Sequence, residues 1–352
     1  MFWSESYFCS KQDDSAANAY GKVKMPRVIE HDLLNRAKQN KNDEFYTQMC
    51  DIERELQYYA SQFSGKTVYC NCDDYRISNF YKYFKSNFQS LSLKKIICSC
   101  YHSQRPDLFN SKGMYCTYSY DCDKKEEREI VYAFNGDGDF RSLECIDLLK
   151  QSDIVVTNPP FSLFREYVHQ LVTYNKHFLI IGNVNAITYK NIFSLIHENK
   201  AWLGVNLGRG ISGFIVPENY PLYGTEVKID EGNNRIVATN GCLWLTNLDN
   251  QIRHERIPLT CCYNGNEDLY PKYDNYDAIN INRTNQIPLD YKGVMGVPIT
   301  FLHKFCPDQF EIVKFRKGDD EKDLRINGKS PYFRILIRKT STEFEKQKTQ
   351  MV

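Results

Sequence analysis

Residues 153–161 read Asp-Ile-Val-Val-Thr-Asn-Pro-Pro-Phe and join a short apolar run to a rigid polar end. The β-branched run predicts a buried strand. The prolines must end that strand, because proline lacks the N–H donor that a strand ladder needs. Ligands of open α/β sheets bind at the carboxyl ends of the strands. We therefore expect a ligand site at Asn158, Pro159, Pro160 and Phe161.

These four residues suit the chemistry of a planar amino group. The Asn158 side-chain oxygen and the Pro159 carbonyl are acceptors that can hold both hydrogens of an exocyclic amine. Two such acceptors favour a pyramidal nitrogen, whose lone pair is no longer delocalised into the ring. Phe161 offers a face for a stacked base, a contact worth about 1–3 kcal/mol. The alternative is a strand that ends in a Pro-Pro turn by chance.

The elements around this motif alternate between strands and helices. We predict strands over 66–72, 94–101, 153–157 and 177–182, helices over 28–63, 78–88, 142–150 and 163–174, and a hairpin within 102–134. This alternation predicts an α/β fold with a doubly wound, mostly parallel sheet. Further short strands are expected at 201–205, 213–216, 242–246 and 332–339. The periodicity weakens beyond about residue 250.

Composition sets limits on the class of protein. The 352 residues carry a net charge of +1, so nucleic-acid binding would need local positive charge or burial around an extruded base. No apolar run is long enough to span a membrane, and no signal peptide is evident at the N-terminus. We therefore expect a cytoplasmic protein without a membrane contact. Two Cys-x-Cys pairs leave zinc as an alternative to reduced thiols, which we favour.

The Asn-Pro-Pro-Phe segment resembles the Asn/Asp-Pro-Pro-aromatic motif of amino methyltransferases that use S-adenosylmethionine. Related motifs act on adenine N6, cytosine N4 or a protein glutamine amide. The longer composite, from about Met25 to Lys339, resembles the EcoRI-type adenine-specific DNA methyltransferases of type II restriction systems. Its blocks are Asp43–Thr47, Tyr69–Asp74, Gly136–Ser142, Asp153–Val168, Trp202–Pro217, Tyr270–Ile281 and Val294–Lys304.

This resemblance implies a methyltransferase-type fold that moves a methyl group from S-adenosylmethionine to adenine N6 in duplex DNA. It implies a monomer that extrudes its target base, the inner adenine of GAATTC, and so protects the DNA from a cognate endonuclease. We divide the chain into a flexible extension (1–25), a catalytic domain (26–249) and a target-recognition region packed on the catalytic sheet (250–352). The rivals are a methyltransferase of other DNA specificity, one acting on RNA or a protein glutamine, and a DNA-binding protein without catalysis.

The resemblance also suggests which residues bind the cofactor. Asp73 or Asp74 would bind its ammonium, although either can instead cap the following helix. The upstream element, with Asp43, Phe45, Tyr46 and Thr47 as candidates, would close over its methionine end; a helix start with acidic residues in its first turn is the alternative. Asp139 is a better candidate than Asp137 to accept from its adenine amine, while Phe140 covers the ring; a plain polar turn is the alternative. The reaction needs no metal.

Candidate DNA contacts follow the central motif. The Gly208–Gly213 stretch matches G-x-G-x-x-G but leads into a strand rather than a helix, so we reject a dinucleotide site there. A tight turn is the expected structure, and it can face the target base, with Arg209 as a candidate DNA contact. Arg253, His254 and Arg256 lie after a strand and can contact phosphates or fill the gap left by an extruded base; a solvated turn is the alternative reading.

Overall fold

The computed structural model describes residues 46–101, 112–206, 211–216, 227–230, 232, 234–237, 241–341 and 343. The chain divides into two units, Met1–Asn42 and Asp43–Val352, and every described residue belongs to the second. The expected extension at 1–25 and the first part of the expected 28–63 helix lie outside the described residues. Within the described part, each helix is too short or too polar to cross a membrane.

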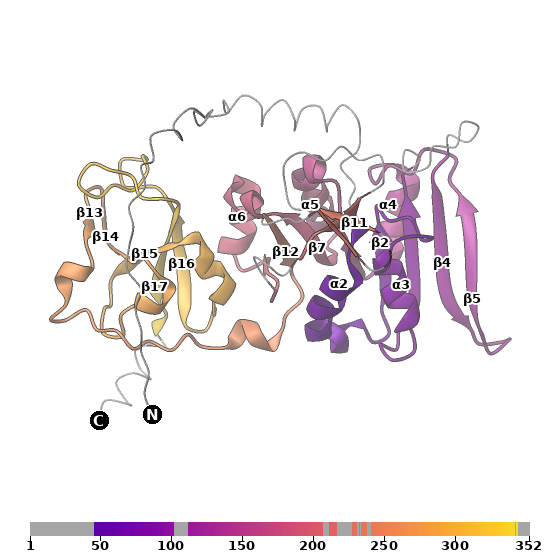
Figure 1. Cartoon of the computed structure of the whole chain (residues 1–352), viewed down its shortest axis with the longest axis horizontal. Helices are drawn as coiled ribbons and strands as arrows, with labels where there is room; N and C mark the ends of the chain where they lie inside the picture. The colour runs from indigo at the N-terminus through magenta and orange to yellow at the C-terminus, as the bar shows by residue number, and fades with distance from the viewer. Residues whose placement is uncertain are drawn as a thin grey trace, which may run out of the picture. The chain divides into compact units, whose positions relative to one another are not determined.

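An eight-stranded sheet with the order β5-β4-β3-β2-β6-β7-β12-β8 forms the centre (Figure 1). Its four middle strands run parallel: β3 (Lys95–Cys100), β2 (Thr67–Asn71), β6 (Ile154–Thr157) and β7 (His177–Asn183). Antiparallel pairings add β4 (Met114–Asp121) and β5 (Glu126–Ala133) on one side, and β12 (Cys242–Thr246) and β8 (Trp202–Leu203) on the other. The predicted sheet is thus correct at its parallel centre, but the whole is mixed, because the hairpin and the returning strands pair antiparallel.

Helices cover both faces of this sheet. Alternate strand residues point to opposite faces. Tyr69 and Val155 share a core with α4 (Leu143–Gln151), α5 (Phe164–Thr173) and α6 (Lys190–His197). Val68 and Val156 share the opposite core with α2 (Met49–Leu56), α3 (Asn79–Ser86) and the 3-10 helix η1 (Gln57–Phe63). This is the expected doubly wound arrangement, although α6 was not predicted.

Side-chain caps define where two of these helices begin. Ser78 accepts a hydrogen bond from the Tyr81 N–H at 3.2 Å and starts α3, and Ser142 accepts from Cys145 at the same distance and starts α4. Each cap satisfies a backbone donor that a helix start would otherwise leave open. Both helices therefore begin directly after a loop at the carboxyl edge of the sheet.

Two smaller sheets complete the described part of the chain. One has the order β1 (Tyr46–Thr47), β9 (Phe214–Val216), β11 (Arg235–Val237) and β10 (Val227–Ile229). The other has the order β13 (Lys272–Tyr273), β14 (Tyr276–Asn280), β15 (Val294–Pro298), β17 (Arg334–Lys339) and β16 (Phe310–Phe315). The remaining 3-10 helices are η3 (Phe161–Leu163), η4 (Val184–Thr188), η5 (Gln251–His254), η6 (Glu267–Leu269), η7 (Thr284–Gln286) and η8 (Ile299–Lys304).

The five-stranded sheet continues the larger hydrophobic core. Its Ile279, Met295 and Ile337 belong to the same buried cluster as the residues of α4, α5 and α6. Phe315 at the end of β16 stacks on Phe193 of α6, with ring centroids 4.6 Å apart. Of the strands in this sheet, only β17 was expected from the sequence, as the strand at 332–339.

Candidate functional site

The strand order reverses beside β2. The chain passes from β2 through α3 to β3 on one side of β2, whereas β6 pairs with β2 on the other side. Ligands of open α/β sheets bind at such a switch point, outside the carboxyl ends of the strands. The residues that follow β2 include Asp73 and Asp74, and those that follow β6 are 158–161. The two predicted groups therefore meet at one edge.

Asp73 is a buried carboxyl group within a network of hydroxyls. Its Oδ1 accepts from Ser78 Oγ at 2.8 Å, and its Oδ2 lies 2.6 Å from Thr157 Oγ1, which also contacts the carbonyl of Asn71. Burial raises the pKa of Asp73 to about 7, against the lowering effect of the two hydroxyls. Thr157 has one hydroxyl hydrogen for two acceptors, so a protonated Asp73 completes the network.

Asp74 has a different environment. Its carboxylate accepts both Nε and Nη2 of Arg76, at 3.0 and 2.6 Å, and its backbone carbonyl accepts from Ile77 and Ser78. Neither aspartate caps α3 directly, because the Ser78 side chain does so. Ser78 and Thr157 are supporting residues that the role assignments from sequence did not include. The Ser78 contact to Asp73 is local, whereas the Thr157 contact joins segments that lie far apart in the chain.

The Asn-Pro-Pro-Phe segment leaves β6 without an intervening residue. Asn158 is 8% exposed and Pro159 is buried. The carbonyl of Pro160 accepts from Leu163 N–H at 3.0 Å, which folds Phe161 into η3. The half-buried Phe161 ring lies 6.0 Å from the Phe214 ring, between centroids. The motif thus holds an amide, a fixed carbonyl and an aromatic ring at the same edge as Asp73.

The strand β1 carries the described part of the predicted closing segment. Tyr46 and Thr47 pair with Ile215 and Phe214 of β9, and Asn79 at the start of α3 donates to the Thr47 carbonyl at 2.8 Å. Thr47 is buried, and its hydroxyl has no hydrogen-bond partner among the residues that the structure describes. The segment is therefore anchored beside the β2 edge. Asp43 and Phe45 lie outside the described residues.

The predicted adenine-binding turn lies next to the end of β3. Gly138 has φ +78°, and a Cβ there would stand 2.6 Å from the Cys100 carbonyl, so the close approach requires glycine. The Asp139 carboxylate accepts Arg141 Nε and Nη2 at 2.8 and 2.7 Å, while Asp137 accepts from the Asp139 N–H.

Phe140, in the same turn, lies in the core rather than on an open face. It is 4% exposed and meets Tyr167 edge to face, with centroids 5.0 Å apart. A ring-covering role for Phe140 therefore depends on the small part of the residue that is exposed. The Asp139 carboxylate, in contrast, accepts the Arg141 backbone N–H at 2.9 Å as well as the Arg141 side chain.

Two buried carboxylates on α2, which the site prediction missed, hold the segment around the glycine-rich turn. Glu55 accepts from the N–H groups of Val205 and Asn206, both at 2.8 Å, and Asp51 accepts from the Ser212 N–H at 2.8 Å. Burial raises the pKa of both carboxyls. Their sequence signal is an acidic i, i+4 pair beside the apolar residues of the same helix. Residues 207–210, including Arg209, lie outside the described residues.

The predicted basic contacts after β12 are engaged within the protein. The Arg253 guanidinium lies 3.7 Å from the Trp202 ring centroid and pairs with Asp249 at 3.3 Å, and its side chain is 8% exposed. Arg253 thus packs against Trp202 and supports the turn at η5 from inside the protein. Arg256 forms an ion pair with the buried Glu343.

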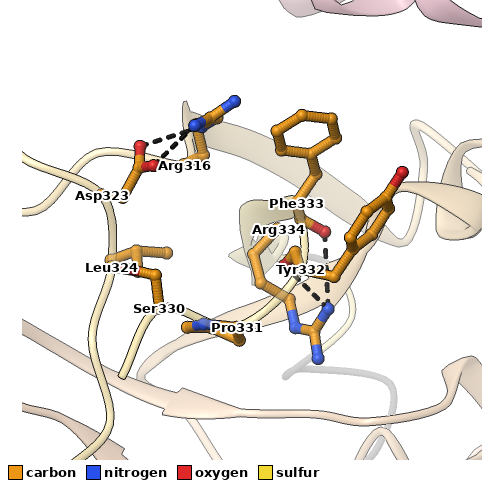
Figure 2. Close-up of a pocket in the computed structure, with 8 residues that line it drawn as sticks. All are labelled: Arg316, Asp323, Leu324, Ser330, Pro331, Tyr332, Phe333 and Arg334. Atoms are coloured by element: carbon orange, nitrogen blue, oxygen red, sulfur yellow. Dashed lines mark hydrogen bonds and ion pairs between the residues drawn. The ribbon is translucent and has the colours of Figure 1, made fainter. Parts of the chain in front are cut away.

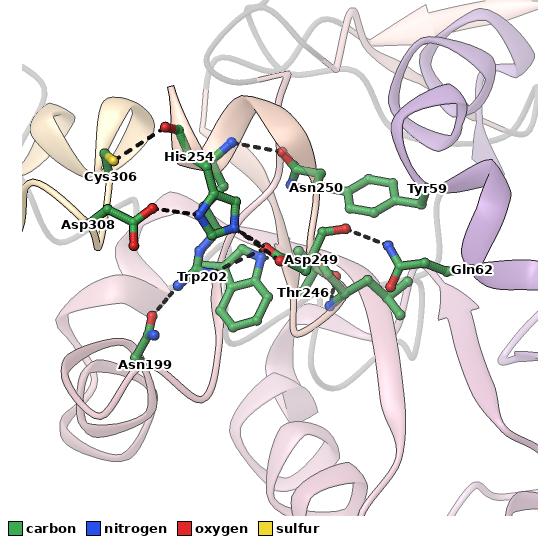
Figure 3. A network of polar contacts seen from close by, with 12 residues as sticks. Tyr59, Gln62, Asn199, Trp202, Thr246, Asp249, Asn250, His254, Cys306 and Asp308 are labelled. Atoms are coloured by element: carbon green, nitrogen blue, oxygen red, sulfur yellow. Dashed lines mark hydrogen bonds and ion pairs between the residues drawn. The ribbon is translucent and has the colours of Figure 1, made fainter. Parts of the chain in front are cut away.

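His254 lies between two carboxylates, as Figure 3 shows. Its Nδ1 is 3.0 Å from Asp308 and its Nε2 is 3.0 Å from Asp249. Hydrogen bonds to Asp308 and Asp249 raise the pKa of this imidazole. The two carboxylates thus favour the protonated form of this half-exposed ring.

The cysteines form no metal site in the described residues. Cys70, Cys98 and Cys116 are register neighbours across β2, β3 and β4 and are buried. Burial raises the pKa of these thiols. The described cysteines are free, and no group of three potential metal ligands was found in the described part of the chain.

Comparisons with known proteins give one consistent result. Residues 33–340 match the family described as adenine-specific methyltransferase EcoRI. The chain is 64% identical over 320 residues to the type II methyltransferase M.EcoRI of Escherichia coli, which covers 89% of this chain and 98% of the relative. It is 42% identical over 323 residues to M.MpnI of Mycoplasma pneumoniae, covering 87% of this chain and 97% of the relative. No solved structure matches the chain.

Proposed function

Because the chain belongs to the EcoRI family of adenine-specific methyltransferases, we propose that it methylates adenine N6 at a specific site in duplex DNA. The proposed target is the inner adenine of GAATTC, and the proposed role is protection of that site from a cognate endonuclease. The observation that carries this proposal is the position of Asn158–Phe161, which follow β6 directly at the switch point of the sheet and share an edge with Asp73.

The residues at this edge fit S-adenosylmethionine as the methyl donor. The buried Thr47 hydroxyl, which has no partner among the described residues, and the Asp73 carboxyl are groups that a polar ligand can satisfy. We assign the ammonium of the cofactor to Asp73, because the Asp74 carboxylate already receives a two-pronged contact from Arg76. A bound cation favours the charged form of Asp73 and would lower its raised pKa.

The other cofactor contacts remain predictions. Tyr46 and Thr47, with Asp43 and Phe45, are proposed to cover the methionine end, and Asp139, rather than Asp137, to accept from the adenine amine. Phe140 would contribute only a small contact, since it is 4% exposed and its ring packs on Tyr167. When bound, S-adenosylmethionine supplies an electrophilic methyl group on a positively charged sulfur.

The target amine is activated by position rather than by a covalent enzyme intermediate. The Asn158 side-chain oxygen and the Pro159 carbonyl accept the two N6 hydrogens of the extruded adenine. Two acceptors in fixed positions favour a pyramidal nitrogen, whose lone pair would form the new C–N bond in line as the bond between the methyl carbon and the cofactor sulfur breaks. Phe161 stacks on the base and is itself in contact with Phe214. The Asn158 and Pro159 acceptors would also hold the methylated amine while its extra proton passes to solvent.

The proposed recognition region covers 250–352 and includes the five-stranded sheet, and the proposed catalytic domain covers 26–249. Arg209, His254 and Arg256 are proposed to face the DNA, with Arg253 supporting the same turn from the Trp202 ring. We further propose a monomer that acts in the cytoplasm, with residues 1–25 as an extension outside the catalytic core.

The substrate class can be tested with tritiated S-adenosylmethionine. The purified protein is incubated with a duplex that contains one GAATTC, a duplex of the same composition without it, a matched RNA and a protein mixture. The proposal predicts label in the first duplex, recovered as N6-methyl-2′-deoxyadenosine after digestion to nucleosides. Label in RNA or protein with none in DNA would overturn it, and label in both duplexes would refute the specificity alone.

A further inference from the structure

A hollow of about 230 Å³ lies at the start of β17 (Figure 2), and its lining includes none of the residues assigned to cofactor and base. It is formed where the loop that enters β17 faces the loop that leaves β16. Its lining residues are Arg316, Asp323, Leu324, Ser330, Pro331, Tyr332, Phe333 and Arg334. Two guanidinium groups and two aromatic rings around one hollow are groups that contact nucleic acids.

One wall of the hollow carries no net charge. Arg316 Nε donates to Asp323 Oδ1 at 2.9 Å and its Nη2 to Oδ2 at 2.5 Å. The same guanidinium lies over the Phe333 ring, 4.3 Å from the centroid. The two-pronged ion pair fixes Arg316 and neutralises Asp323, so this carboxylate does not repel an anion as strongly as a free one would.

The opposite wall presents Arg334 as a fixed cation. Its Nε donates to Asn280 Oδ1 at 3.0 Å, and its Nη1 donates to the carbonyls of Tyr332 and Phe333 at 3.0 and 3.4 Å. Asn280 is itself held by the Tyr273 hydroxyl at 2.9 Å. Among the described residues, no carboxylate forms an ion pair with Arg334, whose side chain also interacts with the Tyr273 hydroxyl.

The geometry of Arg334 selects the kind of ligand. A guanidinium that reads guanine usually offers two nitrogens to O6 and N7. Here Nε and Nη1 donate within the protein, so neither pair of adjacent guanidinium nitrogens is wholly available for a base edge. A single remaining contact suits one anionic oxygen. The Tyr332 side chain beside it is 75% exposed and offers a ring and a hydroxyl to the sugar-phosphate chain.

We propose that this hollow binds a backbone phosphate of the duplex, with Arg334 as the charged contact and Tyr332 beside it. The contact positions the recognition region on DNA without reading sequence, as phosphate contacts do. The inference rests on the proposed function, because it presumes that DNA is the substrate. Because Arg334 is already held by three acceptors, binding orders it little further.

The test is the affinity of Arg334→Gln for two labelled duplexes, with and without GAATTC, measured by fluorescence anisotropy over a range of salt concentrations. We expect a loss of roughly tenfold for both duplexes and a salt dependence that is weaker by about one phosphate contact. Arg338→Gln is the matched control. Arg338 lies on the same strand and is exposed, but it pairs with Glu311 at 2.5 Å, so its removal should leave both affinities unchanged.

A second variant guards against a folding defect. Ser330→Asp adds a negative charge at the exposed rim without removing an anchor of Arg334, and it should weaken both affinities as well. Thermal melting establishes that each variant is folded. If Arg334→Gln and Ser330→Asp bind like Arg338→Gln while the wild type methylates DNA, the phosphate site is refuted and the proposed function stands. A loss confined to the GAATTC duplex also overturns the proposal, in favour of base reading. Wild-type protein that neither binds nor methylates DNA refutes the proposed function itself.

Discussion

Replacing Asp73 by asparagine should stabilise the cofactor-free protein and weaken cofactor binding. The carboxyl is 7% exposed, and burial raises its pKa from 3.8 to about 7. Above pH 7 the folded protein must ionise this buried group, whereas the unfolded chain ionises it freely. For a rise of about three pKa units the cost is about 4 kcal/mol. Seen from the acid side, the protonated carboxyl stabilises the folded state fully below the ordinary pKa of 3.8, and this stabilisation is lost as pH rises through about 7.

Asparagine cannot ionise, so the variant escapes this cost. It keeps one oxygen for the Ser78 and Thr157 hydroxyls in place of two, a loss of about 1 kcal/mol. The expected net gain at pH 8 is about 2–3 kcal/mol in the free energy of unfolding, and it should shrink towards pH 5. In the bound state the charged contact to the ammonium disappears, which costs about 1.5–3 kcal/mol, or roughly 10- to 100-fold in affinity.

Thermal melts at pH 5 and pH 8 measure the stability of the cofactor-free protein, and isothermal titration calorimetry at pH 8 measures the affinity for S-adenosylmethionine. Asp147→Asn is the control, because that carboxylate is exposed on α4 and pairs with Lys150 on the surface. Unchanged affinity in Asp73→Asn would refute the assigned contact. Lower stability at pH 8 than the wild type would refute the reasoning from burial.

Three further predictions concern the base site, α2 and the turn after β12. Asn158→Ala should abolish methyl transfer with cofactor affinity largely intact by calorimetry, whereas Phe161→Ala should lower kcat/KM by about the value of one base stack, 1–3 kcal/mol; normal kinetics in either variant would sink the assignment. Glu55→Gln should lower the free energy of unfolding by about 1–3 kcal/mol in denaturant titrations, because one carboxylate oxygen that accepts a buried N–H is replaced by a donor; exposed Glu53→Gln is its control. The pKa of His254 is raised in the folded protein, so its charged contacts favour folding below pH 6.5 and fade as pH rises through the higher folded value. His254→Gln should therefore lower the free energy of unfolding at pH 6, by under about 1 kcal/mol because the group is half-exposed, and should have no effect at pH 9.

The parallel centre of the sheet was predictable because its signals are local. The strands at 67–71 and 154–157 are short apolar runs with turn residues at their ends, and both lie within one residue or so of the predicted bounds. The parallel pairing of β2 with β6 follows from the strand–helix alternation between them. The position of the Asn-Pro-Pro-Phe segment was predictable too, since its prolines must end the strand.

The rest depended on contacts between distant segments. β14 carries polar residues, and β15 is a short run that contains a glycine and ends in a proline, so neither has a clear alternating pattern. Their sheet is completed by β17 from later in the chain. The Asp73 environment comes from Ser78 and Thr157, and the second of these is 84 residues away. Phe140 looked available for stacking from its place in a polar turn, but its ring packs on Tyr167 of α5. Local sequence gave no sign of that partner.

The most direct test of the central claim is single-molecule mapping of N6-methyladenine on a plasmid treated with the purified protein and S-adenosylmethionine. Digestion by the EcoRI endonuclease follows, and Asn158→Ala serves as the inactive control. The account predicts methyladenine at the inner adenine of GAATTC and resistance to digestion with the wild type, and neither with the variant. Methyladenine produced equally by Asn158→Ala, or no methyladenine from wild-type protein that binds the cofactor, would contradict it.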